Sequence, residues 1–125
     1  RDSIDVEVQG KDIKVHDAYV VLDCGTHINP DTCVAQMEGA VVFGLSLALK
    51  SEITFDKGSA VQGNLDTYEL IRMMESPRVT VDLVQSEALP AGVGEPGVPP
   101  VAPALTNAIF AASGQRIRKL PVSLA

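Results

Sequence analysis

A long apolar segment, residues 30–49, constrains the fold of this chain more than any other part of the sequence. Asn29 is a good N-cap and Pro30 suits the first helical position, so the segment is predicted to form a helix of roughly 30 Å. From Gly39 onward this helix is apolar almost all round, which is typical of a helix that is buried on most sides. The charge-free run from Gly39 to Leu49 has 11 residues, too few to span a bilayer, so we expect no membrane span.

Two segments at the start of the chain have the alternation of apolar and polar residues that predicts β-strands. Residues 4–8 alternate strictly, and residues 13–22 begin with the same alternation and end in an apolar run. Residues 9–12, which lie between them, have the composition of a turn. The two strands are therefore predicted to form a hairpin.

Strand and helix patterns also follow the long helix. Glu52–Phe55 predicts a short strand, and residues 79–83 predict a longer strand with one solvated face. Residues 101–112 have apolar side chains at helical spacing, and Gly114 is a helix stop signal. The order β-β-α-β-β-α predicts an α+β fold with two layers, in which a mixed sheet packs against two helices. We expect a single domain over residues 1–125.

The charge balance restricts the classes of partner. Lys and Arg number 10 against 16 Asp and Glu, so the formal net charge is 10 − 16 = −6. An acidic chain is a poor candidate for binding a phosphate backbone, and we expect no nucleic-acid partner. Two cysteines do not make a disulfide framework, so the compartment, cytoplasmic or periplasmic, stays open. The chain begins at Arg1 without a methionine, and we expect it to be a piece of a longer protein.

Residues 91–100 combine three glycines and three prolines with a single charge, Glu95. The glycines permit unusual backbone conformations and close approach to another group, while the prolines stiffen the stretch. The sequence thus predicts a carboxylate on a rigid turn just before a helix, which suits a general base that faces a bound molecule. The alternative is a surface turn with a solvated glutamate, because turns of this composition are common.

Gln36, in the second turn of the long helix, is the second candidate site residue. Its amide can both donate and accept hydrogen bonds, so it is suited to contact a polar heterocycle or a phosphate group. The alternative is an exposed glutamine at the polar end of an otherwise buried helix. Cys24, His27 and Cys33 offer metal-ligand chemistry, but their spacing matches no common zinc pattern. We expect free cysteines and no metal ligand among them.

Four separated motifs resemble those of the molybdenum hydroxylases. The similarity is to the large, molybdenum-cofactor-binding subunit of the xanthine dehydrogenase and aldehyde oxidase family, and most of all to the isoquinoline 1-oxidoreductase beta-subunit branch. It extends over residues 13–122. The motifs, in chain order, are Asp23-x-Gly25-x3-Asn29-Pro30, Gln36-x-Glu38-Gly39-Ala40-x3-Gly44-Leu45, Asn64-x3-Tyr68, and Gly92-Val93-Gly94-Glu95-Pro96 followed by Pro100-x2-Pro103-Ala104-x2-Asn107-Ala108.

The resemblance implies an oxidoreductase that hydroxylates an electron-poor carbon of an N-heterocycle or an aldehyde with oxygen from water. Glu95 matches the catalytic glutamate, which acts as the general base, and Gln36 matches a glutamine whose amide contacts the pterin cofactor. Large subunits of this family are several times longer, so the resemblance implies that this chain is the C-terminal segment of one. The upstream remainder of that subunit is therefore an expected partner, and the isolated segment is expected to be inactive.

The resemblance also implies a set of cofactors. These are molybdopterin with molybdenum, with or without a cytosine nucleotide, and iron–sulfur clusters on a small partner subunit that receive the electrons. The pterin itself holds the metal, so no protein ligand to molybdenum is expected, and the isolated segment is expected to lack the cofactor. The alternative to the enzyme hypothesis is a non-catalytic binding or assembly module that retains the fold.

Overall fold

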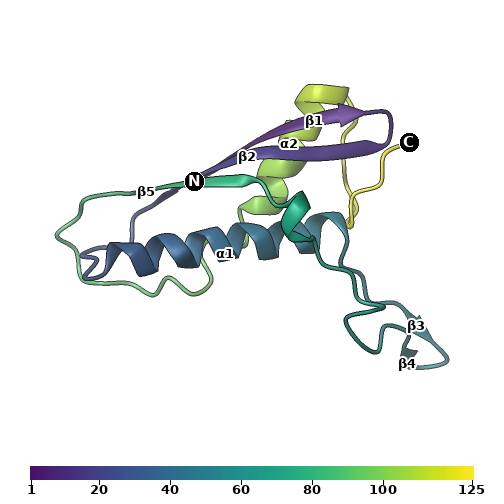
Figure 1. Cartoon of the computed structure of the whole chain (residues 1–125), viewed down its shortest axis with the longest axis horizontal. Helices are drawn as coiled ribbons and strands as arrows, with labels where there is room; N and C mark the ends of the chain where they lie inside the picture. Colours follow the sequence, from purple (N-terminus) through teal and green to yellow (C-terminus); the bar gives the residue numbers. More distant parts are fainter.

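A three-stranded sheet forms one layer of the fold and two helices form the other (Figure 1). The computed structural model describes all residues from Arg1 to Ala125. The predicted α+β class, with a mixed sheet and two helices, is confirmed. The elements are β1 (Asp2–Gln9), β2 (Asp12–Leu22), α1 (Pro30–Leu49), β3 (Phe55–Asp56), β4 (Ser59–Ala60), the 3₁₀-helix η1 (Met73–Glu75), β5 (Arg78–Leu83) and α2 (Val101–Ser113).

The main sheet has the strand order β1-β2-β5. β1 and β2 pair antiparallel as the predicted hairpin, whereas β5 lies parallel to β2. Asp5 pairs with Asp17 and Val6 pairs with Val15, so His16 is an extra residue in β2, a β-bulge. The bulge resets the alternation of side chains along β2, because both Val15 and the alternate residues near the end of the strand are buried.

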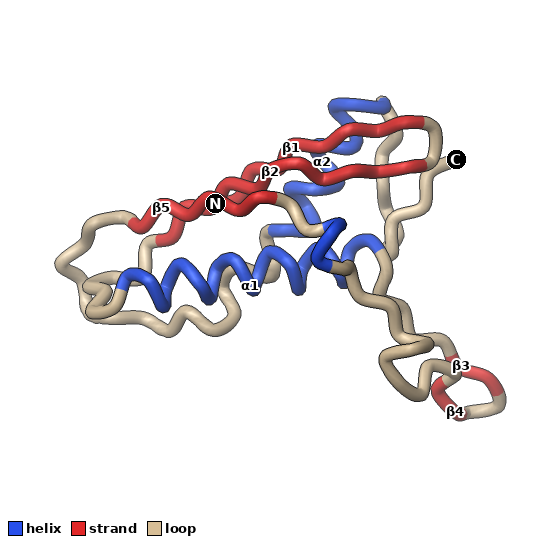
Figure 2. The backbone as a smooth tube through the Cα atoms, in the orientation of Figure 1, coloured by secondary structure: helices blue, strands red, loops and turns tan.

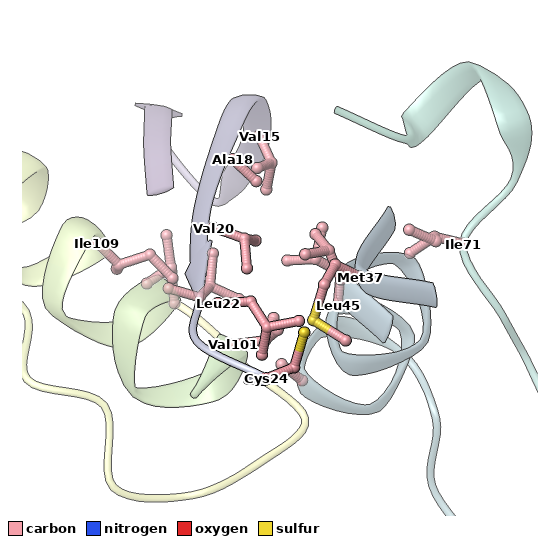
Figure 3. Close-up of a cluster of buried hydrophobic side chains, with 14 residues drawn as sticks. Val15, Ala18, Val20, Leu22, Cys24, Met37, Leu45, Ile71, Val101 and Ile109 are labelled. Atoms are coloured by element: carbon pink, nitrogen blue, oxygen red, sulfur yellow. The ribbon is translucent and has the colours of Figure 1, made fainter. Parts of the chain in front are cut away.

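The hydrophobic core lies between the sheet and the two helices (Figure 3). Helix α1 packs beside β5 and helix α2 packs beside β1, so each helix covers one edge of the sheet. Five large side chains of the helices have no exposed surface, and each therefore contributes about 1.5–3 kcal/mol of apolar burial. They are Met37, Leu45, Val101, Leu105 and Ile109.

Helix α1 begins and ends as the sequence predicts, but only one of its sides is buried. The Asn29 side chain accepts a hydrogen bond from the Thr32 amide at 3.3 Å, which confirms the N-cap. The prediction of burial on most sides is wrong, because Gly39, Phe43 and Leu47 form an exposed stripe. The reason is that the sheet and α2 lie on the opposite side of α1, and no further layer covers the stripe.

By length and composition alone, helix α1 is long and apolar enough to cross a membrane. In this fold it is the central core helix, since Met37 and Leu45 are completely buried against other elements. It packs tightly against α2: a Cβ built on Gly44 would lie 2.8 Å from the Cβ of Val101. Gly44 therefore serves the close approach of the two helices, whereas no atom lies within 4 Å of a Cβ built on Gly39.

The segment predicted as a strand at Glu52–Phe55 does not join the main sheet. Only Phe55 and Asp56 are extended there, and β3 pairs with β4 in a separate two-stranded sheet. Lys57 and Gly58 have φ values of 48° and 84°, which close a tight hairpin turn and keep the pairing local. This hairpin is the tip of an arm, residues 52–69, that projects from the body of the domain (Figure 1).

Candidate functional site

The loop between β5 and α2, residues 84–100, carries the first candidate residue, Glu95. Figure 2 shows this loop in tan, passing the N-terminal end of α1 and returning along that helix to α2. Two sets of contacts anchor it. One joins its first half to the loop that follows β2, and the other seats its second half on α1.

The first anchor consists of hydrogen bonds between residues 24–26 and residues 86–91. The Thr26 amide donates to the Ala88 carbonyl at 2.9 Å, and the Ala91 amide donates to the Cys24 carbonyl at 2.9 Å. The Thr26 hydroxyl also donates to the Ala88 carbonyl, at 3.0 Å. Gly25 lies between these bonds with φ of +73°, and a Cβ at this residue would lie 2.9 Å from the Ala88 oxygen. The chain therefore needs glycine here for both conformation and space.

The second anchor is the contact of Gly97 with helix α1. A Cβ built on Gly97 would lie 2.7 Å from the Cβ of Ala40 and 3.0 Å from the sulfur of Met37. Gly97 is buried, so its missing side chain lets the loop backbone rest directly on α1. The expectation of unusual backbone conformations is wrong for this loop, since no positive φ occurs at Gly92, Gly94 or Gly97.

Glu95 lies between the two anchors and is exposed. Its carbonyl accepts a hydrogen bond from the Val98 amide at 3.0 Å, which closes a turn around it. The three ion pairs of the structure involve the carboxylates of Glu7, Asp17 and Glu75, so the Glu95 carboxylate has no charged partner. A free carboxylate on a backbone held at both ends can present an acceptor to a molecule bound beside it.

Gln36 lies on the same part of α1 as the second anchor. It precedes Met37 and is one helical turn before Ala40, the two residues on which Gly97 rests. Its side chain is exposed. The fold thus brings the turns that carry Gln36 and Glu95 to one section of α1, although the two residues are far apart in the sequence.

The two cysteines lie at this end of the molecule and are free thiols. Cys24 is buried, and this burial, followed by the effect of the neighbouring Cys33, raises the pKa of the Cys24 thiol. A thiol with a raised pKa stays neutral and is a weak metal ligand. No group of three or more His, Cys, Asp or Glu side chains is placed to hold a metal ion, so the zinc hypothesis has no support in the geometry.

The largest cavity lies elsewhere. It has a volume of about 610 Å³ and lies between the turn of the β1–β2 hairpin and the C-terminal end of α1. Its lining carries charges of both signs. Lys11, Lys14 and Lys50 are positive, and Glu75 is negative and forms an ion pair with Lys50 at 2.6 Å. Neither candidate residue lines it. The two candidate residues of the sequence analysis, Gln36 and Glu95, therefore lie apart from this cavity, at the anchored loop and the section of α1 on which it rests.

Thr26 is the residue of this site that the sequence did not single out. The only signal is its place directly after Gly25 in the first of the four motifs. A threonine in a loop forms many kinds of local hydrogen bond, so its bond to Ala88, 62 residues away, cannot be read from the pattern.

The family model described as "Molybdopterin cofactor-binding domain" matches residues 3–77 of this chain. Among curated proteins, the chain is 41% identical over 103 residues to the membrane-bound aldehyde dehydrogenase [pyrroloquinoline-quinone] of Gluconacetobacter polyoxogenes, covering 82% of this chain and 13% of that protein. It is 36% identical over 110 residues to the isoquinoline 1-oxidoreductase subunit beta of Brevundimonas diminuta, covering 88% of this chain and 14% of that protein.

Among solved structures, the reconstituted CO dehydrogenase from Oligotropha carboxidovorans is similar, with a TM-score of 0.73 and 25% sequence identity. The superposition covers 86% of this chain and 15% of the other. In each of these three comparisons the chain matches over most of its own length and over a small fraction of a much longer protein.

Proposed function

The chain belongs to the family of molybdopterin cofactor-binding domains, and from this premise we propose that it is the C-terminal segment of a molybdenum hydroxylase large subunit. The proposed enzyme hydroxylates an electron-poor carbon of an N-heterocycle or an aldehyde, with water as the oxygen source. The names of the two curated relatives, an aldehyde dehydrogenase and an isoquinoline oxidoreductase, support these two substrate classes. The segment alone spans 13% and 14% of these relatives, so the activity belongs to the longer protein.

The observation that carries the proposal is the placement of Glu95. Its carboxylate is exposed and without a charged partner, while its backbone is fixed between the Thr26 and Gly97 anchors. A general base needs a free acceptor at a defined position, because a proton is transferred only across a hydrogen bond of suitable length.

In the proposed reaction, Glu95 accepts the proton that is released as the new carbon–oxygen bond forms. When bound, the molybdenum–pterin group supplies the two-electron oxidation of the substrate carbon. The chain's own contribution is to hold the Glu95 carboxylate in place and to keep it unpaired until the proton arrives. Such general-base catalysis is typically worth about 10²–10⁴-fold in rate.

The residues present fit a pterin-held metal. Gln36 is exposed and offers both a donor and an acceptor, which matches the polar edges of a pterin. One relative's name includes pyrroloquinoline quinone, but we assign molybdopterin because the family model matched over residues 3–77 describes that cofactor. The cytosine dinucleotide form and an iron–sulfur partner subunit are part of the same proposal.

The exposed apolar surface supports a larger assembly. The stripe of α1 ends in Phe43 and Leu47, and the arm exposes 73% of Phe55 and 65% of Leu65. An exposed apolar patch on a folded domain can mark an interaction site. We assign these surfaces to contacts with the remainder of the large subunit, which the relatives' length implies.

The test is Glu95→Gln in the full-length protein. The substitution keeps the volume and the hydrogen-bonding capacity of the side chain and removes the proton acceptor. We expect kcat to fall by at least about 10²-fold with molybdenum content unchanged. Near-normal turnover with full cofactor would make Glu95 a structural residue and would favour a non-catalytic assembly module.

A further inference from the structure

Thr26 makes three hydrogen bonds to one short piece of the loop that carries Glu95. Its amide and its hydroxyl both donate to the Ala88 carbonyl, at 2.9 Å and 3.0 Å, and the hydroxyl also reaches the Ser86 carbonyl at 3.4 Å. These bonds join segments about 60 residues apart in the chain. Thr26 itself lies outside the core and is exposed, so the bonds do more to fix the loop than to bury surface.

The two anchors bracket Glu95 closely. The last bond of the first anchor is at Ala91, and the second anchor begins at Gly97 on α1. Only five residues lie between these two points, and the turn from Glu95 to Val98 takes up part of that length. A shift of the first anchor therefore has little free chain in which to be absorbed before it reaches Glu95.

We propose that Thr26 is a positioning residue that fixes the Glu95 carboxylate through the hydrogen bonds of its hydroxyl to the loop. This inference rests on the proposed role of Glu95 as general base. Thr26 does not touch the substrate or the cofactor in this scheme. Removing its hydroxyl loosens the first half of the loop, and a displacement of about 1 Å at a reacting group can cost about 10²-fold in rate.

The first experiment measures the loop itself, without reference to activity. Amide hydrogen exchange is compared between the wild-type full-length protein and Thr26→Val, which keeps the side-chain shape and removes the donor. We expect faster exchange in residues 86–98 and unchanged exchange in helix α2. Thr26→Ser, which keeps the hydroxyl, should restore slow exchange. Unchanged exchange in residues 86–98 of Thr26→Val overturns the inference.

Thr67→Val is the matched control. The Thr67 hydroxyl also donates to a backbone carbonyl at 3.0 Å, that of Asn64, and its oxygen accepts two backbone amides. It lies in the arm, away from the anchored loop. The control should alter exchange in the arm and leave exchange in residues 86–98 as in the wild type.

The second experiment is a double-mutant cycle in kcat. Thr26→Val should lower kcat by about 10–10²-fold with little change in KM and with full molybdenum content, because Thr26 affects orientation and not binding. In the Glu95→Gln background the same substitution should cause no further loss, since Thr26 acts through Glu95. An equal loss in both backgrounds overturns the inference.

The outcomes separate the inference from the proposed function. If Glu95→Gln loses activity while Thr26→Val keeps a normal kcat, the inference fails and the general-base role stands. If Glu95→Gln keeps full turnover, the proposed function fails, and the inference fails with it. Thr26→Ala serves as a second hydroxyl-free variant if Thr26→Val lowers expression of the folded protein.

Discussion

Gly44 of α1 and Val101 of α2 meet at the point where the two helices cross, where a Cβ on Gly44 would lie 2.8 Å from the Cβ of Val101. Val101 is completely buried and opens α2, so it cannot move aside without displacing the helix. Gly44 is thus the residue that sets how closely the helices approach, and the loop that carries Glu95 leads directly into this crossing.

The first prediction concerns this crossing. Gly44→Ala should destabilise the chain, because overpacking costs about 1–3 kcal/mol and exceeds the gain of about 0.5–1 kcal/mol in helix propensity. Gly39→Ala is the matched control on the same helix, since its Cβ would meet nothing within 4 Å, and it should stabilise by about 0.5–1 kcal/mol. Urea denaturation measures the free energy of unfolding of both variants. Equal stabilisation by the two substitutions would show that the helices can separate freely.

The second prediction concerns Gln36. In the full-length protein, Gln36→Ala should weaken retention of the pterin cofactor by up to about tenfold, because a polar group of the cofactor loses its partner. Molybdenum content and activity should fall together, so that turnover per molybdenum stays close to normal. Glu95→Gln should show the opposite pattern, with full content and low turnover. Metal analysis beside steady-state kinetics distinguishes them, and full occupancy in Gln36→Ala would assign Gln36 to the exposed polar end of the helix.

The third prediction is a pH dependence at the C-terminal end of α1. The Lys50 side chain donates to Glu75 at 2.8 Å and the Arg72 amide donates to it at 2.7 Å. The bond from Lys50, followed by that from Arg72, holds the pKa of Glu75 below its ordinary value of 4.5. A carboxylate whose pKa is lower in the folded than in the unfolded chain stabilises the fold above the unfolded pKa. That stability is lost as the pH falls through the folded pKa.

Wild-type protein should therefore lose stability between about pH 5 and about pH 3 more steeply than Glu75→Gln does. The difference should be at most about 1 kcal/mol, because the Glu75 side chain is 44% exposed and solvent screens the pair. Chemical denaturation at several pH values measures it. Glu69→Gln, at an exposed glutamate on the arm, is the control and should parallel the wild type.

The fourth prediction concerns the isolated chain of 125 residues. The core formed by the sheet and two helices should let it fold, but without turnover, because the proposed cofactor contacts need the remainder of the protein. The exposed arm should make it self-associate. Phe55→Lys with Leu65→Lys should shift the chain toward monomer in sedimentation experiments without changing its circular dichroism. A strictly monomeric wild-type chain, or oxidase activity with bound molybdenum, would contradict this picture.

Local sequence signals predicted the ends of both helices and the strands of the main sheet. Asn29 and Pro30 predict the start of α1, and the alternation in residues 4–8 predicts β1. Gly114 predicts the end of α2, and in the structure it has the left-handed φ of 73° that ends a helix. These features follow from capping, backbone sterics and side-chain period, which act over a few residues. The same reasoning failed at Glu52–Phe55, where the turn at Lys57 and Gly58 keeps the extended residues in a local hairpin.

The sequence by itself determined the β1–β2 hairpin, β5, the two helices, their order and the mixed α+β class, and its motifs single out Gln36 and Glu95. Only the tertiary structure decided that α1 keeps one apolar side exposed, that Gly97 rests on Met37 and Ala40, and that Thr26 holds the loop of Glu95. The physical reason is the distance along the chain over which the deciding contacts act. Helix and strand patterns arise from contacts within a few residues, whereas anchors between segments about 60 residues apart depend on how the elements pack, which no local pattern encodes.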